Sequence, residues 1–213
     1  MAVEPSTRRA DAAAAPIAFT LNGRAVTGRP GESLIEAASR YGVEVPRLCY
    51  KPGMRADGNC RACMVEIKGE RVLAPSCCRF PADGMVVTTD SPRALASQRM
   101  VVELLLSDVA EAIYTRHSEL DDWAARLGVG KPRFAPRVQP PADPSHPAIA
   151  VHLDACIQCG RCVRACREEQ VNDVIGYAFR GSHSKIVFDL DDPMGTRHAW
   201  PAVNACRPVR PGR

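Results

Sequence analysis

The alternation of apolar and polar residues predicts short β-strands in the first ninety residues of the chain. Ile17–Leu21 and residues 24–27 alternate in this way on either side of Asn22-Gly23. Asn-Gly between two such runs is the strongest short-range signal for a two-residue hairpin turn. Met64–Ile67 and residues 71–73, joined through a glycine-containing turn, predict a second hairpin.

A short helix and a final strand complete this part of the pattern. Residues 34–41 are predicted to be helical, with Ser33 as the N-cap and Gly42 as the stop. Residues 85–88 predict the last strand. The combination of hairpins, helix and strand predicts a compact α+β unit over about residues 17–90.

The rest of the chain divides into a helical part, a linker and a second module. Residues 91–107 carry apolar positions at helical spacing and predict an amphipathic helix. Five prolines between residues 131 and 146 predict an extended linker. The expected organisation is a disordered start (1–16), a first domain (17–93), a helical connector (94–130), a Pro-rich linker (131–147), a second module (148–197) and a tail (198–213).

The net charge of +4 belongs entirely to the last residues of the chain. Residues 197–213 contain four arginines and no acidic residue, so the remainder of the chain is neutral. No basic stripe is interleaved with aromatic residues, which argues against nucleic-acid binding.

Nothing in the composition predicts a membrane span. No apolar run approaches the roughly 18 residues that a span requires. Arg8-Arg9 is followed by a charged, weakly apolar segment that does not fit an export signal. We therefore expect a cytoplasmic location, where ten closely spaced cysteines indicate metal or cluster ligation rather than disulfides.

The first cysteine group has the spacing C-x10-C-x2-C-x13-C, formed by Cys49, Cys60, Cys63 and Cys77. Two irons bridged by sulfides need four thiolates, which a wrapping loop and a later strand supply, so a [2Fe–2S] cluster is expected. A four-cysteine zinc site is the alternative, but it normally has two C-x2-C pairs, and only one is present.

Three neighbours of these cysteines add to the prediction. Gly53 and Gly58 suit a backbone that bends tightly around sulfides. Cys78 follows Cys77 directly, and successive side chains of a strand point in opposite directions. Cys78 is therefore expected to be a small buried apolar residue rather than a ligand.

The second group has the bacterial ferredoxin spacing C-x2-C-x2-C-x3-C, except that Arg167 stands where proline usually follows. Its members, Cys156, Cys159, Cys162 and Cys166, predict [4Fe–4S] binding. In two-cluster proteins the fourth cysteine of such a run ligates the other cluster.

With both motifs in place, "LCYKPGMRADGNCRACMVEIKGERVLAPSC" and "CIQCGRCVRACREEQVNDVIGYAFRG" resemble the N-terminal region of the alpha subunit of soluble, molybdenum-dependent, NAD-linked formate dehydrogenases. More distantly they are similar to the large iron–sulfur subunit of complex I and to the diaphorase subunit of NAD-reducing hydrogenases. The resemblance covers about residues 17–198. It implies a β-grasp plant-type ferredoxin domain and then a bacterial-ferredoxin-like module, which relay electrons between a molybdopterin site and flavin/NAD-binding partner subunits.

Two departures from that family are visible. The complex I and hydrogenase relatives carry an H-x3-C-x2-C-x5-C motif after the long helix, but the matching stretch from His117 to Asp121 contains no cysteine. His117 is therefore expected at the surface, and this loss favours formate dehydrogenase over a hydrogenase diaphorase subunit.

The second departure lies in the tail, where the family has another C-x2-C-x2-C-x3-C-P run. Only Cys206 occurs there. A back-translation in which one T is added after the codon of His198 reads C-V-A-C-G-E-C-V-Q-A-C-P. We therefore expect a one-base deletion that truncates the second module, and the alternative is a natural, unrelated tail.

No catalytic acid–base pair, nucleophile or phosphate-binding glycine loop is present, so the chain is expected to be part of an oxidoreductase without its catalytic domain. The alternatives that remain are a hydrogenase or complex I-like iron–sulfur subunit and a zinc-stabilised scaffold without a redox role.

Overall fold

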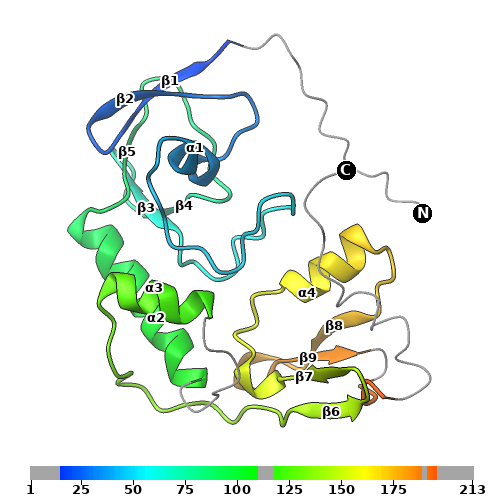
Figure 1. Cartoon of the computed structure of the whole chain (residues 1–213). Helices are drawn as coiled ribbons and strands as arrows, with labels where there is room; N and C mark the ends of the chain where they lie inside the picture. The colour runs from blue at the N-terminus through cyan, green and yellow to red at the C-terminus, as the bar shows by residue number, and fades with distance from the viewer. Residues whose placement is uncertain (1–14, 110–117, 189–190, 196–213) are drawn as a thin grey trace. The chain divides into compact units, whose positions relative to one another are not determined.

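The computed structural model describes residues 15–109, 118–188 and 191–195. The chain forms two compact units, one made of Met1–Val45 and Cys63–Ala94 and the other of Pro46–Ala62 and Leu95–Arg213 (Figure 1). The loop of Cys49 and Cys60 therefore groups with the later part of the chain. None of the described helices is both long enough and apolar enough to cross a membrane.

The first unit contains a five-stranded mixed sheet with the order β2-β1-β5-β3-β4. Its strands are β1 (Ile17–Leu21), β2 (Arg24–Gly28), β3 (Met64–Ile67), β4 (Ala74–Pro75) and β5 (Val86–Thr88). β1 runs parallel to β5, and the other neighbouring pairs are antiparallel.

The predicted Asn-Gly turn is confirmed. Asn22 and Gly23 have φ values of 50° and 79°, the left-handed conformation that a two-residue hairpin of this type requires. The Asn22 amide also donates to Thr89 Oγ1 at 2.8 Å and accepts from the Thr89 N–H at 2.8 Å. The turn is thereby fixed to the end of β5.

The predicted short helix is confirmed as α1 (Leu34–Arg40). The Ser33 N–H donates to Glu36 Oε2 at 2.8 Å, the reciprocal half of a capping box. Gly42, with φ of 74°, follows the helix. Leu34 and Ile35 are almost fully buried, so α1 contributes its apolar side to the core of this unit.

The second hairpin differs from the prediction in its partner strand. β3 pairs with Ala74–Pro75, with Val65 opposite Ala74, rather than with residues 71–73. Val72 is 55% exposed whereas Ala74 is 7% exposed. Because pairing at Ala74 buries its side chain, the strand begins there, and residues 71–73 become part of the connection from β3, which is longer than predicted.

Helix α2 (Pro92–Val109), which belongs to the second unit from Leu95 onward, confirms the predicted amphipathic helix. Helix α3 (Glu119–Leu127) follows within the expected helical connector. An apolar cluster joins the two helices to the cysteine loop through Leu48, Ala62, Val102, Leu120, Ala124 and Leu127. The cluster positions the start of this loop against regular structure.

The Pro-rich segment is less free than a linker prediction implies. Arg133 forms a two-point ion pair with Glu103 of α2, with N–O distances of 2.7 and 2.8 Å. Residues 143–146, predicted as linker, form strand β6 (Asp143–His146), which pairs with β7 (Ile149–Val151). Proline is compatible with this position because β6 has only one neighbouring strand.

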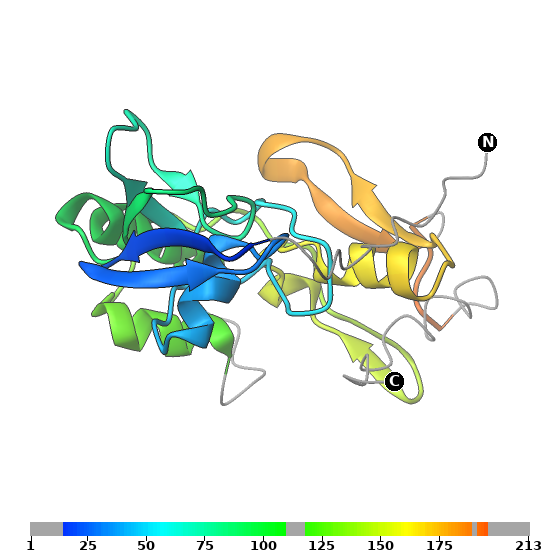
Figure 2. The ribbon, with the colours of Figure 1, turned by 90° about the horizontal axis from the view of Figure 1, so that it is seen from above.

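The second module packs a helical turn on a hairpin (Figure 2). Its hairpin consists of β8 (Ile175–Ala178) and β9 (Lys185–Phe188), and its helix α4 (Arg161–Arg164) continues into the π-helical turn η2 (Ala165–Glu169). Two 3-10 turns, η1 (Leu153–Ala155) and η3 (Gly181–His183), complete it. The core of the module consists of Val163, Cys166, Ile175, Ile186, Phe188 and Met194.

Candidate metal centres

Cys49 and Cys60 face each other within the second unit. The Cys49 N–H donates to Cys60 Sγ at 3.4 Å, and the Cys60 N–H donates to Cys49 Sγ at 3.5 Å. The hydrogen bond with Cys49 and burial raise the pKa of the Cys60 thiol far above its usual range. A largely desolvated thiol such as that of Cys60, which resists losing its proton, becomes a thiolate readily when cationic iron compensates the charge, so the pair fits cluster ligation.

The backbone around these cysteines bends as predicted. Gly53 and Gly58 have φ values of 87° and 63°, and Arg61 has a φ of 59°. A non-glycine residue in this region is strained, and such strain concentrates at functional sites. Arg61 stands between Cys60 and Cys63 in the C-x2-C pair.

Cys63 and Cys77 belong to the first unit, and both are 1% exposed. The carbonyl oxygen of Cys63 accepts hydrogen bonds from Ser76 N at 3.0 Å and Ser76 Oγ at 2.8 Å. These bonds hold the segment before Cys77 beside the start of β3.

The expectation that Cys78 is buried is wrong, because Cys78 is exposed. Residues 76–78 form a turn after β4, in which the Cys78 N–H donates to the Pro75 carbonyl at 3.0 Å, so the alternation of a strand does not apply. The sulfurs of Cys77 and Cys78 are 3.6 Å apart.

The first three cysteines of the second motif lie in a curled segment. Gln158 and Gly160 have φ values of 53° and 71°, and the Gln158 N–H donates to Cys156 Sγ at 3.4 Å. The pKa of Cys156 is raised by burial and by the neighbouring Cys159. Desolvation of the sulfur, together with Cys159 and Cys156, raises the pKa of Cys162 to about 12, although the residue as a whole is exposed.

Cys166 is in different surroundings. It is fully buried in the apolar core of the module, and its sulfur accepts a hydrogen bond from the Val174 N–H at 3.3 Å. Cys206, His117 and the tail 198–213 lie outside the described residues. Within the described ranges, no group of three or more His, Cys, Asp and Glu side chains is arranged to hold a single metal ion.

Two arginines of α4, which sequence reasoning missed, bind the first cysteine loop. Arg164 is 4% exposed, and its guanidinium donates to the carbonyl oxygens of Cys49 and Arg55. Arg161 donates to the carbonyl oxygen of Tyr50 at 3.1 Å and pairs with Glu119. The partners of Arg164 are 109 and 115 residues away in the sequence, so no local pattern could have indicated them.

A third link joins the two motifs directly. The Asn59 side-chain amide donates to the Gln158 carbonyl oxygen at 2.8 Å, and the Tyr177 hydroxyl donates to the same oxygen at 2.9 Å. Asn59 precedes Cys60, and Gln158 precedes Cys159. Backbone and side-chain bonds therefore connect the two cysteine motifs within the second unit.

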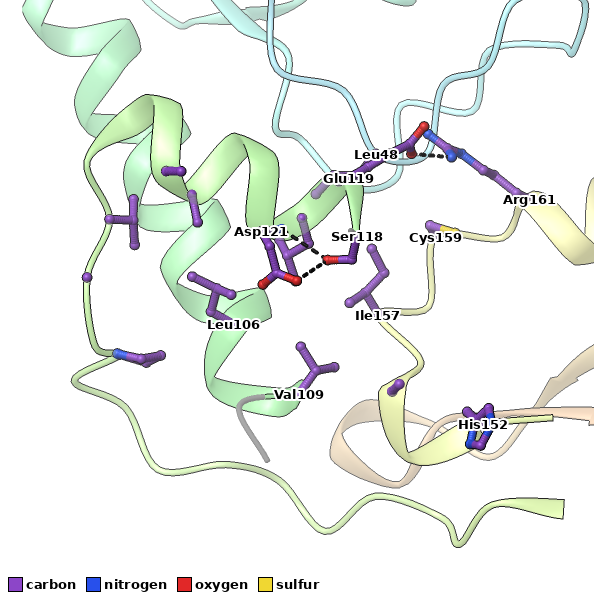
Figure 3. Close-up of a pocket in the computed structure, with 17 residues that line it drawn as sticks. Leu48, Leu106, Val109, Ser118, Glu119, Asp121, His152, Ile157, Cys159 and Arg161 are labelled. Carbon is purple, nitrogen blue, oxygen red and sulfur yellow. Dashed lines mark hydrogen bonds and ion pairs between the residues drawn. The ribbon is translucent and has the colours of Figure 1, made fainter. Parts of the chain in front are cut away.

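A cavity of about 720 Å³ opens beside the second motif, where Figure 3 shows Cys159, Ile157 and Leu48 along its lining. Ser118 and Asp121 also line it. Ser118 Oγ donates to Asp121 Oδ2 at 2.6 Å and accepts from the Asp121 N–H at 3.0 Å. Ser118 is thereby the N-cap of α3, and Asp121 supplies the N–H that its side chain caps.

Comparison with known families assigns two segments of the chain. Residues 14–92 match a 2Fe-2S iron-sulfur cluster binding domain, and residues 146–209 match the ferredoxin-like domain of NADH-quinone oxidoreductase subunit 3. The first match contains the cysteines from Cys49 to Cys77, and the second contains those from Cys156 to Cys166. The second match also extends past residue 198 into the predicted tail.

The relatives come from two groups of oxidoreductases. The chain is 35% identical over 71% of its length to a subunit of the NADH-quinone oxidoreductase of Rhizobium meliloti, and covers 19% of that protein. It is 32% identical over 78% of its length to the NADP-reducing hydrogenase subunit HndD of Solidesulfovibrio fructosivorans, and covers 30% of it. The chain thus spans about a fifth to a third of the length of these relatives.

A solved structure of an oxidoreductase is also similar to this chain. A chain of an NAD+-reducing [NiFe]-hydrogenase in the H2-reduced state matches with a TM-score of 0.75 and 28% identity, over 83% of this chain and 79% of the other. Formate dehydrogenase is not specifically supported by these comparisons. The chain is related to the N-terminal iron–sulfur region of the NADH-quinone oxidoreductase and NAD-reducing hydrogenase family, with a [2Fe–2S] domain followed by a ferredoxin-like [4Fe–4S] domain.

Proposed function

We propose that this chain is an iron–sulfur electron relay of a cytoplasmic, multi-subunit, NAD-linked oxidoreductase. The proposed ligands are Cys49, Cys60, Cys63 and Cys77 for the [2Fe–2S] cluster, and Cys156, Cys159, Cys162 and Cys166 for [4Fe–4S] binding. The sheet of the first unit, with α1 packed among its buried residues, supports a β-grasp ferredoxin fold.

The main support for this proposal is the set of hydrogen bonds that connects the two cysteine motifs. Asn59 reaches from the position before Cys60 to the Gln158 carbonyl, and the N–H of Gln158 donates to Cys156 Sγ. A bound iron–sulfur cluster supplies one-electron chemistry. The residues of the chain hold the two ligand loops at a fixed separation and surround the sulfurs with N–H donors, which a relay requires.

The electron partners form the finer part of the proposal. We propose a flavin/NAD-binding subunit on one side and a molybdopterin site that oxidises formate on the other. The resemblance of the two cysteine motifs and the absence of cysteine between His117 and Asp121 support the formate assignment. The match with a hydrogenase chain, which covers 79% of that chain, supports a hydrogenase or complex I-like relay equally well.

Metal analysis and spectroscopy of anaerobically prepared protein test the relay. We expect iron and acid-labile sulfide, and a rhombic spin-½ signal on reduction that persists well above helium temperature. Zinc without sulfide would contradict the proposal and support a scaffold. Molybdenum-free protein should not oxidise formate with any acceptor dye, and turnover would show that the chain is more than a relay.

The partner is tested by reduction through the flavin subunit. Genes that neighbour this one should supply a flavin/NAD-binding subunit and either a molybdopterin or a nickel–iron subunit. NADH with the flavin subunit should reduce the clusters of this chain, and the Cys49→Ser variant should lose the [2Fe–2S] part of that reduction. A chain with intact clusters that no neighbouring flavin subunit reduces would contradict the proposed place in the complex.

A further inference from the structure

Arg164 is a buried cation beside both cysteine motifs. It lies on α4 between Cys162 and Cys166, and its guanidinium donates to the carbonyl oxygens of Cys49 and Arg55. Its Nε is buried and has no hydrogen-bond partner in the described part of the chain. The charge remains in place at all physiological pH values, because a guanidinium does not lose its proton in proteins.

No carboxylate of the described residues lies within ion-pair distance of Arg164. The neighbouring cations are paired: Arg161 with Glu119, Arg55 with Glu168, and Arg167 with Asp173. Removing a charge from water without a counter-charge is expensive, so buried charges are normally paired or stand against a metal centre. Two carbonyl oxygens supply partial charges only.

We propose that Arg164 is a positioning residue whose counter-charge is the cluster held at Cys49. This inference rests on the proposed function and deepens it. A cluster with four thiolate ligands is an anion, and Arg164 donates to the peptide carbonyl of one of its ligands. Because the guanidinium of Arg164 donates to two carbonyl oxygens of the first cysteine loop, it fixes the position of that loop and the distance between its own charge and the cluster.

The expected consequence is electrostatic. When dithionite reduces the cluster, one electron enters and its negative charge increases by one unit, so a fixed neighbouring cation stabilises the reduced form more than the oxidised form. Arg164 therefore raises the reduction potential of the [2Fe–2S] centre. Arg161 has less effect, because Glu119 already neutralises it.

The test compares three variants of the full chain by EPR-monitored redox titration. Arg164→Met removes the charge and should lower the [2Fe–2S] midpoint potential beyond the scatter of replicate titrations. Arg164→Lys keeps the charge, and its midpoint potential should remain nearer to that of the unmodified protein. Arg161→Met, the matched control on the same helix, should shift the potential less than Arg164→Met.

The outcomes separate this inference from the proposed function. Unmodified protein without iron and sulfide would refute the relay itself. Intact [2Fe–2S] signals with an unchanged potential in Arg164→Met would overturn only the role of Arg164, as would equal shifts in Arg164→Met and Arg164→Lys. If Arg164→Met takes up no cluster, the result with Arg164→Lys is decisive. An Arg164→Lys variant whose [2Fe–2S] midpoint potential is near that of the unmodified protein supports the inference, and an Arg164→Lys variant without a cluster overturns it.

Discussion

The side-chain amide of Asn59 donates a hydrogen bond to the carbonyl oxygen of Gln158, with 2.8 Å between nitrogen and oxygen. The two residues are 99 positions apart in the sequence, and each is next to a cysteine of a different cluster motif. The bond therefore joins two ligand loops that the chain brings together only on folding. Arg164 and Arg161 reinforce the same junction through the backbone of the first loop.

Asn59→Ala should loosen the first cysteine loop without unfolding the protein. Asn59 is exposed, so its loss removes one hydrogen bond and buries no unsatisfied side chain. We expect a cost of about 0.5–1.5 kcal/mol, seen as faster amide hydrogen exchange around residues 49–60. Gln170→Ala is the control, because Gln170 is exposed and its side chain has no hydrogen bond among the described residues. Equal exchange in both variants would show that the junction does not depend on Asn59.

Cys77→Ser should damage the [2Fe–2S] centre, whereas Cys78→Ser should spare it. Cys77 is 1% exposed and belongs to the buried core, whereas Cys78 is exposed on the turn that follows β4. Iron content and the integrated spin-½ signal measure the difference. Their sulfurs are 3.6 Å apart, so a signal retained in Cys77→Ser and lost in Cys78→Ser would assign the ligand to the exposed thiol.

The hydrogen bond from Arg133 holds the pKa of Glu103 below its usual value of 4.5. A carboxyl group whose pKa is lowered in the folded state stabilises the fold above its unfolded pKa, and this contribution is lost as the pH falls through the folded pKa. Carbon NMR should therefore find Glu103 titrating at a pH below the ordinary range of a glutamate side chain.

Arg133→Met should return the pKa of Glu103 to its ordinary range and release the Pro-rich segment from α2. Arg126→Met serves as the control, because Arg126 lies over the Trp123 ring on α3. An unchanged Glu103 pKa in Arg133→Met would mean that the ion pair does not persist in solution.

Local signals account for the parts of the structure that the sequence predicted. Asn22-Gly23 needs only its own backbone conformation to form a turn, and Ser33 with Glu36 forms a cap within one helical turn. The cysteine spacings likewise indicate cluster binding from residues that are close together in the sequence. Each of these features depends on residues a few positions apart.

Features that depend on distant packing were not predictable. The exposure of Cys78 follows from a turn that ends β4, and β4 itself is placed by burial of Ala74 opposite Val65. The hydrogen bonds of Arg164 require helix α4 to meet the first cysteine loop, which lies more than a hundred residues earlier in the chain. A charged residue in a cysteine motif gives no indication of such a partner, because exposed arginines are common in any sequence.

The surroundings of Cys166 separate it from the three cysteines before it, and this separation leads to the last prediction. Cys156, Cys159 and Cys162 lie in the same curled segment, and burial together with Cys159 and Cys156 raises the pKa of Cys162. The sulfur of Cys166 instead lies in the apolar core and accepts a hydrogen bond from the Val174 N–H. In a two-cluster arrangement the fourth cysteine serves the other cluster. Cys156→Ser should therefore abolish the [4Fe–4S] signal of the first three cysteines, and Cys166→Ala should retain it.

Low-temperature EPR with iron and sulfide analysis measures both variants after anaerobic reconstitution. Cys166→Ala removes a buried sulfur, so we expect a loss of stability of about 1 kcal/mol, which thermal unfolding reports independently of cluster content. If Cys166→Ala remains folded but loses every [4Fe–4S] signal, Cys166 is the fourth ligand of the same cluster. The apolar core would then have to open for its sulfur to reach iron, because in the present structure Cys166 is fully buried.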